Sequence, residues 1–325
     1  MANASMRDVA ARAGVSVATV SHVINNTRYV AEGTRERVQA AIEELNYNPD
    51  TMARIFKTGR TNLVGFVVPN ISDPFFSTLI EEVESVLSRQ NYRLVVTNSH
   101  EDEQREIENL RFLCNGLVDG IIIASAQRSY ESIQKVLPEN FPIVFIDRTV
   151  AFCPKDVIRV NTYSTVLEAT EDFIRKGHSK IVCFQNSPYL STCVERLDAY
   201  RDAIHKHGLE PNIIPLVNTL STQLELYLDQ VMECGASVLI APNNITSMAS
   251  ARYFYRHNIT IGKDIELVAF QDVPEPNILL SNASLIKQPV LELGRTAAKR
   301  ILERINKPDL PITETVLQSN YIPRP

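Results

Sequence analysis

Tryptophan is absent from the 325 residues, and glycine occurs only 11 times. The cysteines are odd in number and widely scattered, at Cys114, Cys153, Cys183, Cys193 and Cys234. No two of them form a Cys-x-x-Cys pair, and no histidine stands at ligand spacing from one. This pattern predicts reduced, mostly buried thiols rather than disulfides or a zinc site.

Long apolar runs are also missing. No stretch approaches the ~20 apolar residues of a membrane-spanning helix. The first eight residues lack a basic region followed by an apolar stretch, so we expect no signal peptide, no membrane partner and a cytoplasmic protein. Apolar residues still make up 44% of the chain, which is enough to bury a sizeable core, and the length suits two or three domains.

The common signatures of enzymes do not occur. The chain holds no Gly-x-Gly-x-x-Gly, no Gly-x-x-x-x-Gly-Lys-Ser/Thr and no Gly-x-Ser-x-Gly. Its six histidines show no ligand pattern. The segment KGHSK at 176–180 indicates the end of a helix before a strand, and HKH at 205–207 indicates a solvated helix end. We therefore expect neither an enzyme nor a metal or cofactor site.

Charge is distributed unevenly along the chain. Residues 1–60 contain eight basic and six acidic side chains, whereas the remainder contains 25 basic and 32 acidic ones. A mildly basic head on an acidic body suits a head that contacts a polyanion, although the asymmetry alone is weak evidence.

The first 47 residues predict helices only. A short helix is expected from Met6 to Ala13, with Gly14 at its end. Ser16 can cap a second helix, in which Val17, Val20, Val23 and Ile24 recur at helical spacing. A third, longer helix is expected to begin at Thr34 and to end before Asn48–Pro49, because proline disfavours helix at the preceding residue.

From Asn62 the pattern changes to short apolar strands that alternate with helices. Such runs include LVGFVV at 63–68, GIIIA at 120–124, KIVCF at 180–184 and ELVAF at 266–270. Strands buried on both faces and separated by helices predict parallel sheets with right-handed crossovers. About ten strands are many for one sheet, so we expect an α/β body of two doubly wound lobes, with a ligand in the cleft between them.

The segment at 6–25 fits a helix-turn-helix, in which the second helix enters the DNA major groove. His22 is the one long polar side chain aimed where base edges would lie, and Val17 and Ala18 can make apolar contacts only. Phosphate contacts are expected from Ser16, Thr19, Ser21 and Asn25. The alternative is an ordinary helical hairpin in a core.

The head motif points to a family. The stretch RDVAARAGVSVATVSHVINN at 7–26, followed by VAEGTRERVQAAIEELNYNPDTMARIFKTGRTNLVGFVVPNISDPFF at 30–76, resembles the lactose repressor/galactose repressor (LacI/GalR) family of bacterial transcription regulators. The resemblance extends along the whole chain and thins toward its end. It implies an effector-controlled repressor that binds pseudo-palindromic double-stranded DNA as a homodimer, with a periplasmic-binding-protein-like body.

The resemblance also implies a domain plan. Residues 1–48 would form the helix-turn-helix domain, 49–61 a hinge helix and linker, and 62–325 the effector-binding and dimerisation domain. Lobe 1 of the body would span about 62–157 and 288–316, and lobe 2 about 158–287 and 317–325.

Further DNA contacts follow from the resemblance. Val17, Ala18 and His22 fall at the family's base-reading positions, and Arg28 and Tyr29 fall in a loop that contacts the backbone and neighbouring bases. The hinge helix binds the minor groove in the family, which implies contacts from Met52, Ala53, Phe56 and Lys57. Phe56 stands where the family usually inserts a leucine between base steps, and phenylalanine is also a known minor-groove wedge. The alternative for Phe56 is a core or linker aromatic.

The effector cleft is likewise predicted from matching positions. These are Phe75, Phe76, Asp147, Arg148, Thr192, Arg196, Asn243 and Gln271. Each also has a structural interpretation, such as a core aromatic for Phe75, a strand-end cap for Asp147 or a surface ion pair for Arg196.

Three departures from the family pattern concern the charge of the cleft. Amides stand where the family usually has acids, in Asn161-Thr162, Asn243-Asn244 and Gln271-Asp272, and a common cleft aromatic near Leu220 is absent. Because Arg148 and Arg196 remain, we hypothesise an anionic effector, a sugar acid or sugar phosphate, gripped bidentately by Arg196. The rival hypothesis is a body that has drifted and binds no ligand tightly, which the low glycine count favours slightly.

A second class of function shares the body alone. A periplasmic solute-binding protein should have a signal peptide and no helix-turn-helix, and both features argue against it here.

Overall fold

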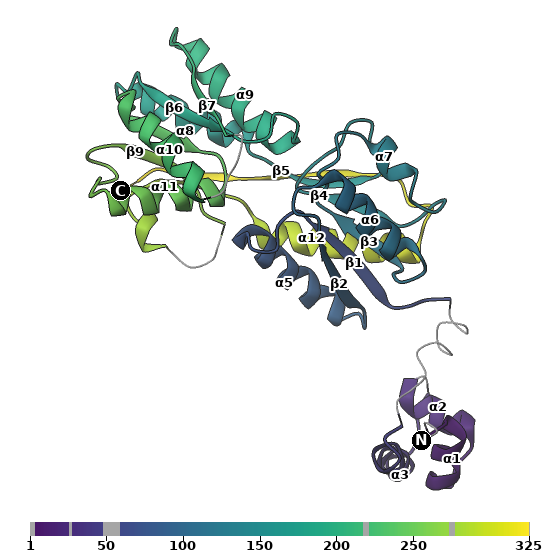
Figure 1. Cartoon of the computed structure of the whole chain (residues 1–325). Helices are drawn as coiled ribbons and strands as arrows, with labels where there is room; N and C mark the ends of the chain where they lie inside the picture. Colours follow the sequence, from purple (N-terminus) through teal and green to yellow (C-terminus); the bar gives the residue numbers. More distant parts are fainter. Residues whose placement is uncertain (1–3, 26–27, 48–58, 217–220, 273–276, 325) are drawn as a thin grey trace. The chain divides into compact units, whose positions relative to one another are not determined.

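The computed structural model describes residues 4–25, 28–47, 59–216, 221–272 and 277–324, and Figure 1 shows the chain coloured along its sequence. The contacts divide it into two compact units, Met1–Thr61 and Asn62–Pro325. The hinge helix expected at 50–57 lies outside the described residues. Within the described residues, no helix combines the length and apolar character needed to cross a bilayer.

The first unit is a three-helix head of α1 (Met6–Ala13), α2 (Val17–Asn25) and α3 (Glu32–Glu44). Ser5 and Asp8 cap α1 reciprocally, and Gly14 ends it in the left-handed region at φ 67°, which glycine adopts without strain. The core of the head consists of apolar side chains from all three helices and from the segment after α3, including Val9, Val20, Val38 and Tyr47.

Two details of the head can be compared with the expectations. Ser16 caps α2 as predicted, because its Oγ accepts from the backbone N–H of Thr19 at 3.1 Å. The predicted start of the third helix at Thr34 is wrong, since α3 begins two residues earlier. The backbone N–H groups of Thr34 and Arg35 both donate to the carbonyl of Ala31, which forms the first turn without a side-chain cap.

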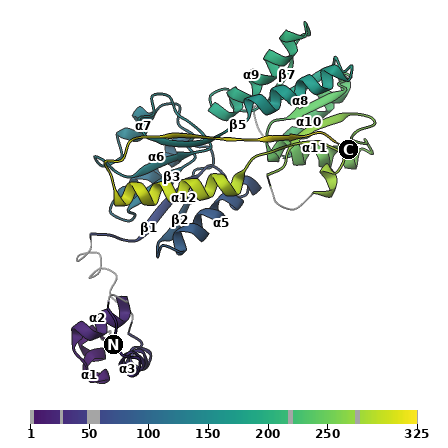
Figure 2. The same ribbon diagram turned by 180° about the vertical axis from the view of Figure 1, so that it is seen from behind.

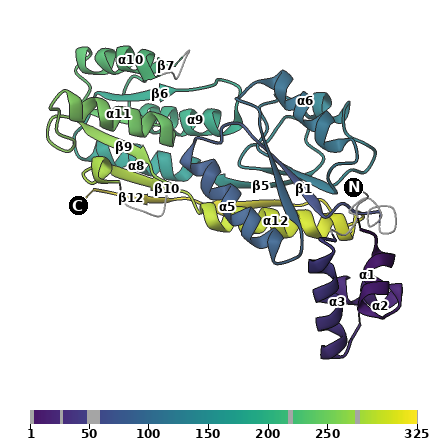
Figure 3. The ribbon, with the colours of Figure 1, turned by 60° about the horizontal axis from the view of Figure 1, so that its bottom comes forward.

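The second unit contains two six-stranded sheets. The first has the order β11-β5-β4-β3-β1-β2 and is parallel throughout. Its strands are β1 (Leu63–Val68), β2 (Arg93–Asn98), β3 (Gly120–Ile123), β4 (Ile143–Ile146), β5 (Asp156–Asn161) and β11 (Glu314–Gln318). The helices α5 (Pro74–Ser88) and α12 (Val290–Asn306) pack together on one face, as Figure 3 shows, and α6 (Glu103–Cys114) and α7 (Tyr130–Gln134) pack on the other.

The second sheet has the order β12-β10-β9-β8-β6-β7, and only its β10–β12 pair is antiparallel. Its strands are β6 (Ile181–Gln185), β7 (Asn212–Pro215), β8 (Val238–Ala241), β9 (Glu266–Phe270), β10 (Ser284–Lys287) and β12 (Asn320–Ile322). Its covering helices are α8 (Tyr163–Arg175) and α9 (Ser191–Lys206) on one face, and α10 (Ser221–Glu233), α11 (Asn244–Arg256) and the 3-10 turn η1 (Ile278–Leu280) on the other. The expectation of two doubly wound lobes is therefore confirmed.

The chain passes between the sheets three times: after β5, after β10 and after β11. Figure 2 shows β5 beside the yellow C-terminal strand β11. The predicted lobe boundaries at 157/158 and 316/317 fall inside β5 and β11. Both strands remain in the first sheet beyond these boundaries, because β5 and β11 stay paired as far as Asn161 and Gln318.

Candidate functional site

The outer face of α2 presents the side chains that sequence reasoning assigned to base contacts. Val17 is 42% exposed, Ala18 is exposed and His22 is half-buried, whereas Val20 and Val23 on the opposite face are buried in the head core. The head therefore buries one face of α2 and leaves the other accessible, which is the arrangement that a groove-reading helix requires.

The residues predicted to contact phosphates differ from one another in exposure and in their hydrogen bonds. The hydroxyls of Ser16 and Thr19 hydrogen-bond to each other at 2.9 Å at the start of α2, and Ser21 is half-buried within it. Arg28 and Tyr29 are exposed, with Tyr29 at 94%. The side chain of Asn25 and the whole of Met52, Ala53, Phe56 and Lys57 lie outside the described residues.

The body contains a pocket of about 70 Å³ where strands of both sheets end. Seven of the eight residues predicted for the effector line it, and only Gln271 does not. The walls come from the segments that follow β1, β2, β4, β8, β9 and β10 and from the first turns of α5 and α9. Ligand binding at the carboxyl ends of parallel strands is the rule for open α/β sheets.

Arg148 forms a bidentate ion pair in one wall of this pocket. Its Nη1 and Nη2 donate to Oε2 and Oε1 of Glu101 at 2.7 and 2.8 Å. Its Nε is buried, has no hydrogen-bond partner and lies 3.5 Å from the carboxylate of Asp147. The guanidinium charge is therefore neutralised within the protein, and one buried N–H remains to serve a ligand.

Asp147 follows β4 in an unusual backbone conformation, with φ 65°. This region is strained for a residue with a Cβ, and aspartate is among the few that tolerate it. Burial raises the pKa of Asp147, and the charges of Arg148 and Arg196 oppose that rise. Its carboxylate lines the pocket as a hydrogen-bond acceptor.

Arg196 lies on α9 and is already bound by groups of the protein. Nε donates to Oγ1 of Thr162 at 3.3 Å, Nη1 to the carbonyl of Pro242 at 2.6 Å and Nη2 to Oε1 of Gln288 at 3.2 Å. Its Cζ lies 4.1 Å from the ring centroid of Phe270, in a cation–π contact. These contacts use three of the five N–H groups of the guanidinium and leave one on Nη1 and one on Nη2, so the bidentate grip of Arg196 on an anion stays a prediction.

Asp272, rather than Gln271, supplies the side chain that follows β9 in the pocket. Its carboxylate accepts from the backbone N–H and Nε2 of Gln288, both at 2.9 Å, and from Nδ2 of Asn244 at 2.8 Å. Gln271 is buried and lies outside the lining. Its contact with the effector therefore stays a prediction that the lining of this pocket does not support.

The charge balance of the pocket opposes the anionic-effector hypothesis. Four carboxylates line it, against two guanidinium groups. These acids are Asp73, Glu101, Asp147 and Asp272. Burial raises the pKa of Asp73, Asp147 and Asp272, so each is costly to ionise beside a further anion. The arrangement suits a neutral ligand with several hydroxyl groups.

Four lining residues escaped the sequence prediction, namely Asn70, Glu101, Cys193 and Ile245. Asp73, Asn244, Asp272 and Gln288 belong to motifs that the resemblance placed at the cleft, although they were not named as ligand contacts. Asn70 lies shortly after Val68, the last residue of strand β1, so its position near a strand end was an available signal. Glu101 gave none, because its role depends on pairing with a residue 47 positions away.

Among the described residues, no group of three or more His, Cys, Asp or Glu side chains is arranged to hold a metal ion. Cys193 lines the pocket, and burial raises the pKa of its thiol.

Two family models match the chain. Residues 5–50 match "Bacterial regulatory proteins, lacI family", and residues 61–324 match "Periplasmic binding proteins and sugar binding domain of LacI family". Together they cover both units.

Individual relatives agree with these matches. The chain is 32% identical to the ribose operon repressor of Bacillus subtilis (strain 168) over 97% of its own length and 95% of the relative's. It is 31% identical to the HTH-type transcriptional repressor PurR of Vibrio atlanticus (strain LGP32), over 94% and 93%. These relatives are transcriptional repressors rather than enzymes.

Its fold is that of a solved lac repressor dimer bound to operator and the anti-inducer ONPF, with a TM-score of 0.84 at 21% identity, covering 99% of this chain and 98% of that one.

Proposed function

Because this chain belongs to the LacI family of bacterial regulatory proteins, a family of DNA-binding repressors with a sugar-binding domain, we propose that its effector is a neutral monosaccharide bound between the two sheets of the body. The observation that carries this proposal is the pocket lining, in which four carboxylates surround two guanidinium groups that protein acceptors already engage. A periplasmic solute-binding role is not favoured, since the family match includes the DNA-binding head.

The chemistry of the lining fits sugar hydroxyls. Carboxylates such as Asp147 accept hydrogen bonds from hydroxyl groups, and the buried Nε of Arg148 can donate to a hydroxyl oxygen. Phe75 and Phe76 lie in the same pocket at the start of α5, and their rings meet edge-to-face with centroids 5.0 Å apart. They offer an apolar surface to the C–H face of a sugar ring.

A pentose is the monosaccharide that we favour. The support is the ribose operon repressor of Bacillus subtilis, which is similar over nearly the full length of both chains. The small size of the pocket, about 70 Å³, agrees with a compact ligand.

For the DNA side, we propose that two copies of the chain bind a pseudo-palindromic operator through α2 and the segment at 50–57. His22 would donate to base edges, Arg28 and Tyr29 would contact the backbone, and Phe56 would insert into the minor groove. Binding to chromosomal DNA places the protein in the bacterial cytoplasm. The effector would shift the equilibrium between two body conformations by its difference in affinity for them.

The test is thermal unfolding of the full-length protein with ribose, other pentoses, hexoses, sugar acids, sugar phosphates and purines. A ligand at about 100 times its Kd adds about 2.7 kcal/mol of stability, which raises the Tm by several degrees. Stabilisation by a neutral pentose alone supports the proposal. Stabilisation by sugar phosphates or purines instead, or by no compound in the panel, would overturn it.

A further inference from the structure

A second, larger cavity of about 260 Å³ lies at the amino end of β4, the strand whose carboxyl end leads to the effector pocket. Its walls come from the segment before β4, the start of β5, the last turns of α12 and the loop between α12 and β11. Since β4 and β5 are parallel, this cavity lies at the amino edge of the first sheet, whereas Asp147 and Arg148 follow the carboxyl end of β4. The two cavities share no lining residue.

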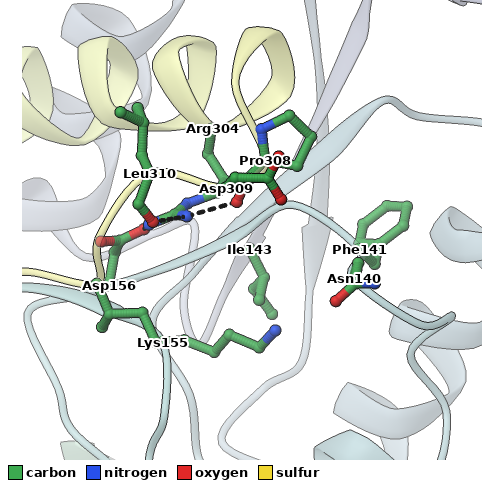
Figure 4. Close-up of a pocket in the computed structure, with 10 residues that line it drawn as sticks. Asn140, Phe141, Ile143, Lys155, Asp156, Arg304, Pro308, Asp309 and Leu310 are labelled. Atoms are coloured by element: carbon green, nitrogen blue, oxygen red, sulfur yellow. Dashed lines mark hydrogen bonds and ion pairs between the residues drawn. The ribbon is translucent and has the colours of Figure 1, made fainter.

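A network of ion pairs forms one side of the cavity. Asp156 accepts from Nε and Nη2 of Arg304 at 2.9 and 2.7 Å and from Nη2 of Arg300 at 2.8 Å. Arg304 also donates to the backbone carbonyls of Pro308, Leu310 and Pro311. These contacts fix the loop after α12, and they leave neither Asp156 nor Arg304 available to a ligand (Figure 4).

Two other charged side chains of the lining are available. The half-buried side chain of Lys155 and the exposed side chain of Asp309 make no hydrogen bond and no ion pair with any described residue. In Figure 4 they lie on opposite sides of Ile143. The four charged groups of the lining sum to zero, because Asp156 offsets Arg304, and one cation and one anion remain without a partner.

The rest of the wall is mostly apolar. It consists of Phe141, Ile143, Pro308, Leu310 and Ile312, with Asn140 as its one uncharged polar residue, and Ile312 is 57% exposed. Isolated apolar surface residues need no explanation, but here they border a cavity that also holds two unpaired charges. A volume of about 260 Å³ lies just below the usual range for small-molecule sites, which begins at about 300 Å³.

We propose that this cavity binds a free amino acid with an apolar side chain, with its carboxylate on Lys155, its ammonium group on Asp309 and its side chain against Phe141 and Ile143. A simple anion would meet the Asp309 carboxylate, and a simple cation would meet the Lys155 ammonium. A zwitterion satisfies both groups and keeps the site neutral. The site is separate from the effector pocket, so the protein would carry two small-molecule sites, at opposite ends of β4.

The test uses the full-length protein and three related probes in isothermal titration. Phenylalanine carries both charges, N-acetylphenylalanine lacks the ammonium group and phenylalaninamide lacks the carboxylate. We expect phenylalanine to bind and each blocked compound to bind about tenfold more weakly or worse, because each loses one charge-assisted contact. Equal binding of all three, or no binding of phenylalanine, would overturn the proposal.

Location is tested in two independent ways. The K155M and D309N variants should each weaken phenylalanine binding about tenfold, while K307M, on the same loop but outside the lining, should not. In NMR spectra of isoleucine methyl groups, phenylalanine should shift the resonances of Ile143 and Ile312. The resonance of Ile245, which lines the effector pocket, should stay unchanged. Shifts at Ile245 alone, or unchanged affinity in K155M, would show that the amino acid binds elsewhere.

Discussion

The guanidinium carbon of Arg128 lies 3.6 Å from the ring centroid of Tyr189, which joins a loop of the first sheet to a loop of the second. Nε of Arg128 also donates to Glu103 at 3.3 Å, and a second contact between the halves runs from the backbone N–H of Thr149 to Oγ of Ser191 at 3.0 Å. Both contacts adjoin the first turn of α9, which carries Thr192 into the effector pocket.

This cation–π contact should hold the two halves closed over a bound effector. In Tyr189→Ala we expect effector affinity to fall about two- to fivefold, mainly through faster dissociation, since an exposed cation–π contact contributes about 0.5–1 kcal/mol. Stopped-flow dissociation and calorimetry measure this. Tyr189→Phe retains the aromatic ring and should behave like the parent protein, and a similar loss in that variant would contradict a role for the ring face.

The buried Glu106 should make stability depend on pH. This residue lies in α6 with no exposed surface, and it accepts from Oγ of Ser125 and the backbone N–H of Ala126, both at 2.6 Å. Burial raises its pKa from 4.5 to about 7, although these hydrogen bonds oppose the rise. The folded protein therefore binds a proton that the unfolded chain has lost between pH 4.5 and about 7, so Glu106 lowers stability progressively as pH rises through that window.

Replacing Glu106 by glutamine removes this titration. The stability of Glu106→Gln relative to the parent protein should increase from pH 5 to pH 8 by up to about 3 kcal/mol. Urea unfolding at a series of pH values measures the difference. Glu108→Gln, on the exposed side of the same helix, is the control and should show no such trend. A stability difference for Glu106→Gln that stays constant between pH 5 and pH 8 would exclude the titration.

Asp272 should be required for effector binding through its hold on Gln288 and Asn244. In Asp272→Asn, the amide cannot accept all three hydrogen bonds that the carboxylate accepts. The side chains of Gln288 and Asn244 are then no longer held in position in the pocket wall. We expect the sugar that stabilises the parent protein to bind at least about tenfold more weakly. Asp264→Asn makes the same chemical change at an exposed site of the same lobe and should keep the parent affinity. Equal affinities in the two variants would show that Asp272 does not act at the ligand.

The sequence predicted most of the body where strands are continuous apolar runs. Strand β1 (Leu63–Val68) and strand β9 (Glu266–Phe270) were predicted at their observed bounds, because burial on both faces leaves little ambiguity. The edge strand β11 (Glu314–Gln318) was missed, since only one of its faces is partly covered and its residues alternate between exposed and half-buried. Local patterning cannot reveal a strand whose pairing partner, β5, lies about 155 residues earlier in the chain.

The site shows the same division between local and long-range information. The resemblance placed Asp147, Arg148 and Asn243 at strand ends in the cleft, and all three line the pocket, because parallel strands bring their carboxyl ends together. The anionic ligand class inferred from those residues stays a prediction, because it counted amides in the sequence and could not count Glu101. That carboxylate neutralises Arg148 through a contact that only the fold creates.

On the DNA side, His22 should discriminate between base sequences. His22 lies on α2 beside the exposed Val17 and Ala18, on the face turned away from the head core. In His22→Ala we expect the difference in binding free energy between operator and scrambled DNA to shrink by about 1–3 kcal/mol, because one base contact is lost and phosphate contacts persist.

Fluorescence anisotropy with both DNAs, at several salt concentrations, measures this difference. The slope of affinity against salt reports the phosphate contacts, so it should be the same for His22→Ala and the parent protein. His205→Ala, at the exposed end of α9, is the matched control and should leave both affinities unchanged. If His22→Ala weakens operator and scrambled DNA equally and reduces the salt slope, the imidazole contacts the phosphate backbone, and sequence reading must come from Val17, Ala18 and residues beyond α2.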